Sequence, residues 1–130
     1  NIKRIWKQLR SKMSKTENIK RFGNVIELKP DKLEEYKALH ADSHPGVRHL
    51  LTKYNIKNYS IFLHQFDDGK YFLFSYFEYV GYDYYYDMEQ LKNEPENQRW
   101  WELTDPCQGP LKNRQPDEQW SQMEEVYYNH

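Results

Sequence analysis

The chain is short of the residues that cross-link, anchor or hinge a fold. Its single cysteine, Cys107, excludes an internal disulfide and fits a reducing compartment. No apolar run approaches the roughly 18 residues that a membrane helix needs, and no signal-peptide core is present. The five glycines are scattered, which excludes a glycine-rich phosphate loop. These absences predict a cytoplasmic protein with no membrane segment.

Aliphatic residues are also scarce, and the mean hydropathy is −1.13. The chain instead carries twelve tyrosines and six phenylalanines, so aromatic rings must build much of its core. Tyrosines suit half-buried positions at which the ring is covered and the hydroxyl contacts water, as in clefts and interfaces. At 130 residues the chain has the size of one domain and can bury a core without metals or disulfides.

Charge is unevenly spread, although the net charge is only −1. Residues 1–21 hold eight of the 19 Lys and Arg and one of the 20 Asp and Glu. We expect residues 1–20 to be a basic extension, disordered or extraneous to the fold, because Met13 resembles an ordinary start. Residues 21–130 are expected to form a single domain. Their acidic balance argues against nucleic-acid binding, which needs clustered positive charge.

Periodicity predicts an α+β fold. Alternating or apolar runs indicate strands, and spacings of three and four indicate helices. Asp31 is expected to cap the first helix in a capping box with Glu34, and Pro45-Gly46 to interrupt that helix. The expected elements are a strand at 21–28, a helix at 31–55, strands at 56–66 and 71–79 around an Asp67-Asp68-Gly69 turn, helices at 83–91 and 95–103, a loop at 107–119 and a strand at 120–128.

This β-α-β-β-α-β order is the ferredoxin-like arrangement. It places both helical segments on one face of an antiparallel sheet. The strand at 71–79 is almost wholly apolar or aromatic, so we expect it to be central and covered on both faces. Because the helices cover only one face, a two-fold homodimer is expected to cover the other, giving a dimeric α+β barrel.

Tyr36 and His40 are spaced i, i+4, which puts them on one helical face. Histidine both gives and takes protons near neutrality, and a nearby phenol can orient it or bind the group it serves. His44, one turn further, extends this stripe. A metal site is disfavoured, because His40 and His44 have no evident third ligand. Such a Tyr-His pair is also common as plain surface or core structure.

Trp100 and Trp101 stand side by side in a charged stretch. Successive helical residues point about 100° apart, so at most one indole can sit centrally on a buried stripe. The other needs a subunit, loop or ligand contact, and an indole face suits a sugar ring. The pair alone favours burial in a core or dimer. Asp105 is a candidate polar residue beside it, or else the start of an Asx turn before a proline.

Together these residues resemble the L-rhamnose mutarotase family. Four stretches between about Arg21 and Tyr128 carry the resemblance: the Pro30-Asp31 to Glu35-Tyr36-Lys37-Ala38-Leu39-His40 segment, Asn58-Tyr59-Ser60-Ile61, Gln98-Arg99-Trp100-Trp101, and Met123-Glu124-Glu125-Val126-Tyr127-Tyr128. The resemblance implies a small cytoplasmic dimer that interconverts the α and β anomers of L-rhamnose or a related 6-deoxy sugar, without a cofactor.

The resemblance also implies roles. His40 is the proton donor, and Tyr36, Tyr59, Trp100 and Trp101 line the monosaccharide pocket. His44 departs from the family pattern, which has a tryptophan at its position. Two alternatives remain open: a sugar-binding module without catalysis, and a cofactor-independent oxygenase or haem-handling protein on the same barrel.

Overall fold

The computed structural model describes residues 1–8 and 19–130. Residues 2–8 are helical, whereas Met13 and the rest of 9–18 lie outside the described residues, so the nature of the extension stays a prediction. The body contains β1 (Lys20–Leu28), η1 (Pro30–Lys32), α2 (Leu33–Leu39), α3 (Arg48–Lys53), β2 (Ile56–Gln65), β3 (Tyr71–Tyr79), α4 (Tyr84–Asn93), α5 (Pro95–Thr104), η2 (Asp105–Cys107), β4 (Gln108–Gly109) and β5 (Ser121–Met123).

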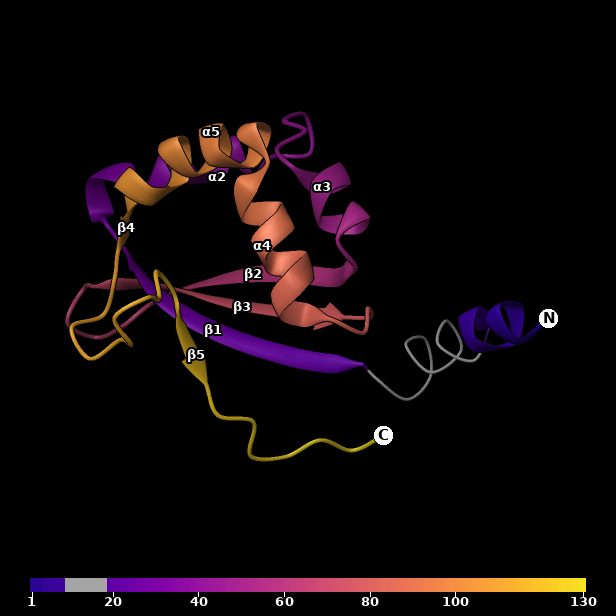
Figure 1. Ribbon diagram of the computed structural model, residues 1–130. Coiled ribbons are helices and arrows are strands. Elements are labelled where there is room, and N and C mark those ends of the chain that lie inside the picture. Colours follow the sequence, from indigo (N-terminus) through magenta and orange to yellow (C-terminus); the bar gives the residue numbers. More distant parts are fainter. Residues whose placement is uncertain (9–18) are drawn as a thin grey trace.

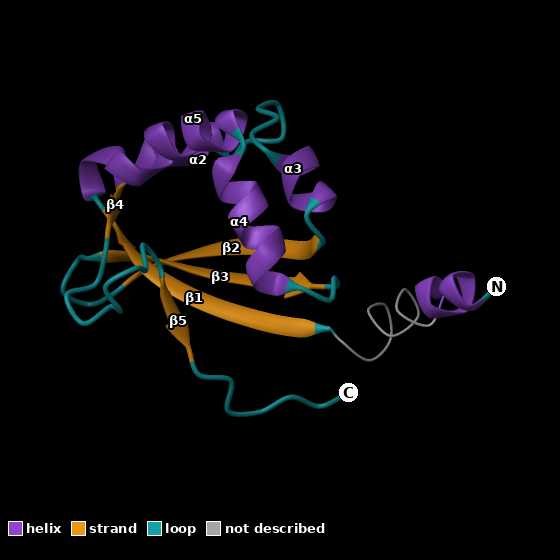
Figure 2. Cartoon of the chain, in the orientation of Figure 1, coloured by secondary structure: helices purple, strands orange, loops and turns teal. Residues whose placement is uncertain are grey.

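The strands form one antiparallel sheet in the order β2-β3-β1-β4, with β5 also paired to β1. The helices lie over one face of this curled sheet (Figure 1; Figure 2). The predicted α+β order is therefore confirmed. The turn at Gly69 is also confirmed: its φ of 87° suits glycine, and the Lys70 N–H bonds the Asp68 side chain.

Two apolar clusters hold the layers together. One joins sheet to helix: Ile26 and Leu28 of β1 and Leu73 of β3 pack with Tyr36 and Cys107. The other joins helices. In it Val47, Leu50 and Leu91 are buried, and the partly buried side chains of Leu51, Tyr54, Met88 and Trp100 pack against them. Members of both clusters, among them Tyr36 of the first and Leu91 and Trp100 of the second, line the cleft described below.

The helix expected at 31–55 needs correction. Asp31 lies inside the 3₁₀ turn η1, whose N-cap Lys29 makes no side-chain cap bond, so the predicted capping box is wrong. Helix α2 ends at Leu39, and a helix resumes only at Arg48. Pro45 disfavours helical backbone at the residue before it, and Gly46 has a φ of 54°. The interruption therefore extends over the whole 40–47 segment.

The C-terminal strand is shorter than expected. Only Ser121–Met123 pairs with β1, and the tail beyond it continues without strand pairing toward the start of β1 (Figure 1). Side-chain contacts replace the ladder, because Arg21 pairs with Glu125 at 2.8 Å and lies over the Tyr128 ring. The acidic residues after Met123 stay solvated, so nothing rewards burying this stretch in a sheet. The short strand β4, in turn, falls where a loop was expected.

Strand β3 is central, as expected, but only one of its faces is covered within this chain. Side chains alternate across a strand, so Phe72 and Phe74 point away from the helices while Leu73 points toward them. Phe62 of β2, the register partner of Phe74, is 65% exposed. Within this chain only the helix-facing side of β3 is covered, and cover of the other face by a second copy stays a prediction.

Candidate active site

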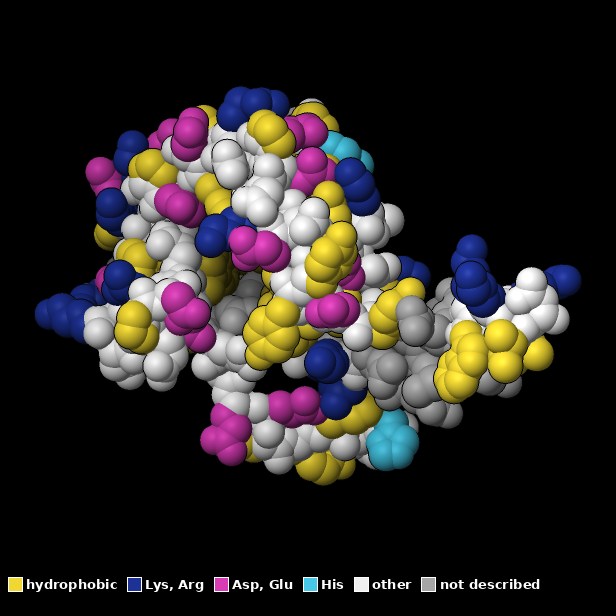
Figure 3. Space-filling model, in the orientation of Figure 1, with side chains coloured by type: hydrophobic (Ala, Val, Ile, Leu, Met, Phe, Trp, Pro, Cys, Tyr) yellow, Lys and Arg dark blue, Asp and Glu magenta, His cyan; other side chains and the backbone are white. Residues whose placement is uncertain are grey.

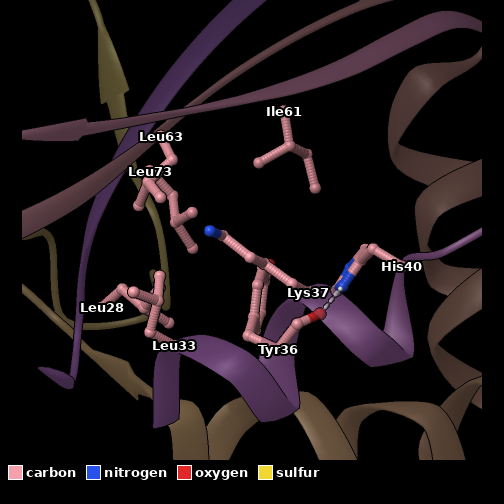
Figure 4. A pocket seen from close by; sticks show the side chains of 8 residues that line it. All are labelled: Leu28, Leu33, Tyr36, Lys37, His40, Ile61, Leu63 and Leu73. Atoms are coloured by element: carbon pink, nitrogen blue, oxygen red, sulfur yellow. Dashed lines mark hydrogen bonds between the residues drawn. The ribbon is translucent and has the colours of Figure 1, made fainter. Parts of the chain in front are cut away.

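A cleft of about 1070 Å³ lies between the helices and the concave face of the sheet. Figure 3 shows apolar side chains inside a hollow below the helical layer. All seven predicted site residues line this cleft: Tyr36, His40, His44, Tyr59, Trp100, Trp101 and Asp105. A smaller pocket of about 190 Å³ adjoins it, in which Tyr36 and His40 face Ile61, Leu63 and Leu73 of the sheet (Figure 4).

His40 is the C-cap of α2 rather than a mid-helix residue. Its Nδ1 lies 2.8 Å from the Tyr36 carbonyl oxygen, and a carbonyl only accepts, so Nδ1 carries the proton of the neutral ring. Burial lowers the pKa of His40, although this backbone hydrogen bond opposes the shift. Near pH 7 the ring is therefore neutral, with a free lone pair on Nε2.

Tyr36 is buried beneath this imidazole. The two rings stack with centroids 4.2 Å apart, and the Tyr36 hydroxyl accepts a hydrogen bond from Gln108 Nε2 at 3.4 Å. Burial strongly raises the pKa of Tyr36, more than the Gln108 bond lowers it. The phenol therefore stays protonated, and its own O–H remains available to another acceptor.

Gln108 is a site residue that the sequence did not reveal. Its side chain is only 4% exposed, and its Oε1 accepts a hydrogen bond from Gln119 Nε2 at 3.2 Å. These contacts link the 107–119 segment to Tyr36. No spacing signal distinguishes Gln108, because it lies in a polar stretch whose composition predicts a loop.

The two tryptophans divide as predicted. Trp100 is half-buried in the helical cluster, and its indole lies 5.2 Å from His40 and 5.6 Å from His44, measured between ring centroids. Trp101 is 38% exposed and also lines the cleft. One indole thus belongs to both core and cleft, while the other is free to contact a ligand.

Tyr59 reaches the cleft through a bulge in β2. The register with β3 shifts between Lys57 and Ser60, and Asn58 has a φ of 53°, a conformation that asparagine adopts more readily than most residues. The Tyr59 ring stacks on Phe77 at 5.4 Å, and burial raises the pKa of Tyr59 to about 12. Bulges commonly redirect a side chain next to an active site.

His44 and Asp105 occupy the edges of the site. His44 lies in the turn after α2, so the predicted continuous helical stripe is wrong, yet its ring still faces Trp100. The Gly46 N–H donates to His44 Nδ1 at 3.3 Å. Asp105 begins η2, and burial raises its pKa.

Two negative observations apply to the described part of the chain. Residues 1–8 and 19–130 contain no group of three or more His, Cys, Asp and Glu placed to hold a metal ion. Within the same ranges, no helix has the length and apolar character needed to cross a membrane.

Comparisons with known proteins show the fold and the family of this chain. No curated protein sequence matches the chain. A crystal structure of an L-rhamnose mutarotase from Formosa agariphila superposes with a TM-score of 0.62 at 22% identity, covering 85% of this chain and 99% of that one, which shows a shared fold. The L-rhamnose mutarotase family model matches residues 21–129. The chain belongs to the L-rhamnose mutarotase family and is a sugar mutarotase, an isomerase that interconverts anomers.

Proposed function

We propose that His40 moves the proton during anomer exchange of L-rhamnose or a related 6-deoxy sugar. The observation that carries this assignment is the 2.8 Å contact of Nδ1 with the Tyr36 carbonyl. Because that contact occupies one ring nitrogen, Nε2 is left as a base beside Trp100. Burial, which lowers the pKa of His40, keeps that base unprotonated at neutral pH.

A single histidine can act as both the base and the acid of ring opening. Nε2 of His40 takes the proton of the C1 hydroxyl, the electron pair of that O–H bond forms the aldehyde, and the C1–O5 bond breaks. The ring oxygen takes the electron pair of the broken bond and receives the proton from the His40 imidazolium. Rotation about the C1–C2 bond and the reverse sequence give the other anomer. General acid–base catalysis of this kind contributes about 10²–10⁴-fold.

The other cleft residues take supporting roles in this proposal. The Tyr36 hydroxyl, which accepts from Gln108, donates its proton in a hydrogen bond to the ring oxygen as charge develops there. Trp100 and Trp101 pack against the apolar face of the sugar, and Tyr59 bonds a hydroxyl. Asp105 lies at the rim, where its carboxyl can bond a further hydroxyl.

The substrate is tested by exchange NMR between the α and β anomer signals, with L-rhamnose, other 6-deoxy hexoses, ordinary hexoses and pentoses. We expect the largest acceleration over the uncatalysed rate with L-rhamnose or a close 6-deoxy relative. Binding of L-rhamnose without faster exchange would contradict the catalytic role of this cleft.

We further propose that the protein is a cytoplasmic homodimer. The uncovered sheet face supports the dimer, because Phe62, Phe66, Phe72 and Phe74 gather there and Phe66 contacts the rings of Phe72 and Phe74. Exposed apolar patches of this kind mark association surfaces. The location rests on the sequence argument alone.

A further inference from the structure

Two histidines face the same indole in the cleft. The centroids of His40 and His44 lie 5.2 and 5.6 Å from the Trp100 ring, and both side chains line the cleft. The two rings are close enough to interact electrostatically, because a charge on His44 lowers the pKa of His40. A ligand packed against Trp100 therefore lies within reach of both imidazoles.

Backbone groups fix opposite tautomers in the two rings. The Tyr36 carbonyl can only accept, so it bonds a protonated Nδ1 of His40. The Gly46 N–H can only donate, so it bonds an unprotonated Nδ1 of His44. In the neutral state His40 therefore offers a lone pair at Nε2, whereas His44 offers an N–H at Nε2.

The turn that carries His44 is built for this arrangement. Gly46 adopts a φ of 54°, which favours glycine, and a Cβ added there would lie 3.5 Å from the Trp100 ring. The Gly46 N–H thus reaches His44 from the same turn that packs on the indole. The nearby charged groups, Arg48 and Asp42, pair with each other at 3.3 Å.

We propose that His44 is a substrate-binding residue whose Nε2–H donates a hydrogen bond to an oxygen of the sugar held against Trp100. This inference rests on the proposed function and deepens it. The two histidines then have different roles. His40 accepts the proton that moves during anomer exchange, and His44 binds the sugar by a hydrogen bond. The contact favours sugars that present a hydroxyl or ring oxygen, not a methyl group, to this side of the indole.

The first test compares His44→Phe, which removes the donor, with His44→Gln, which keeps one. His49→Phe is the matched control, because His49 is exposed and pairs with Glu96 outside the cleft. Anomer-exchange NMR with L-rhamnose gives kcat and KM for each variant. We expect His44→Phe to raise KM about two- to tenfold, the effect of one neutral hydrogen bond, with a smaller change in kcat. His44→Gln should recover most of the loss, and His49→Phe should match the wild type.

The second test needs no substitution. In ¹⁵N-histidine-labelled protein above pH 7, the ring shifts should report Nδ1–H for His40 and Nε2–H for His44, and L-rhamnose should shift the His44 Nε2 signal. An unchanged KM in folded His44→Phe, or the same tautomer in both rings, would overturn the inference. These results are distinct from failure of the proposed function, in which the wild-type protein itself would not accelerate exchange.

Discussion

His40 and Tyr36 touch each other twice. Their rings stack at 4.2 Å, and Nδ1 of His40 lies 2.8 Å from the Tyr36 carbonyl oxygen. The first contact covers one face of the imidazole, and the second fixes its tautomer. A residue at the end of a helix is thereby made a neutral base with one free nitrogen.

The pH dependence should follow from this neutral base. Burial, and secondarily the charges of His44 and Arg48, lower the pKa of His40, while catalysis requires its unprotonated form. We therefore expect kcat/KM to stay level around neutrality and to fall only as the pH drops below about 6.5, the ordinary value for histidine. Exchange rates measured from pH 4.5 to 8 would check this. A fall beginning above pH 7 would show that the pKa is raised instead.

Tyr36→Phe keeps the stacked ring and the backbone carbonyl but removes the hydroxyl. We expect kcat to fall about 10²-fold, as when one donor to a developing oxyanion is lost, with KM less affected. Circular dichroism should show an unchanged fold. Wild-type kcat in this variant would exclude the phenol as a donor to the ring oxygen.

Gln108 should act through Tyr36. In Gln108→Glu the carboxylate can only accept, so the Tyr36 O–H would turn toward it and away from the sugar. Gln108→Met merely removes the bond. We expect Gln108→Glu to lower kcat more than Gln108→Met does, with KM nearly unchanged in both. Equal losses in the two variants would indicate a packing role alone.

Substituting the two tryptophans should have different effects: Trp100→Ala should reduce both stability and sugar binding, and Trp101→Ala mainly sugar binding. Trp100 packs in the helical cluster, so Trp100→Ala should lower the free energy of unfolding by about 2 kcal/mol or more and also weaken sugar binding. Trp101 is largely outside the core, and Trp101→Ala should change stability by less than about 1 kcal/mol while raising KM. Urea unfolding and exchange kinetics measure the two effects. A large stability loss from Trp101→Ala would contradict this division.

The uncovered sheet face should mediate dimerisation. Phe62→Lys places a charge in the proposed interface and should shift the mass measured by light scattering from dimer to monomer. Tyr85→Lys, on the exposed side of α4, is the matched control and should leave the mass unchanged. A monomeric wild-type protein would contradict the proposed dimer.

Local patterns predicted most of the fold. The strands, the Gly69 turn and the start of α5 at Pro95 follow from periodicity and turn chemistry. The capping box at Asp31 failed because a 3₁₀ turn precedes the helix. The terminal strand was overextended because alternation alone does not show whether a partner continues beside it.

All seven residues predicted for the site line the cleft, but the sequence predicted neither Gln108 nor the hydrogen bonds between these residues. Spacing and the family resemblance pointed to Tyr36, His40, Tyr59 and the two tryptophans. The tautomers of His40 and His44 depend on which backbone groups lie beside them, and the Gln108 contact joins β4 to α2. The Gln108 contact joins residues 72 positions apart, so no local pattern encodes it. The two histidine contacts are local, but they depend on α2 ending at Leu39, which the periodicity did not predict.

The most direct measurement is anomer-exchange NMR of L-rhamnose with the wild-type chain and with His40→Ala, using His49→Ala as the control. The account predicts fast exchange for the wild type and the control, and exchange slowed about 10²–10⁴-fold in folded His40→Ala. Exchange at the wild-type rate in His40→Ala would contradict it.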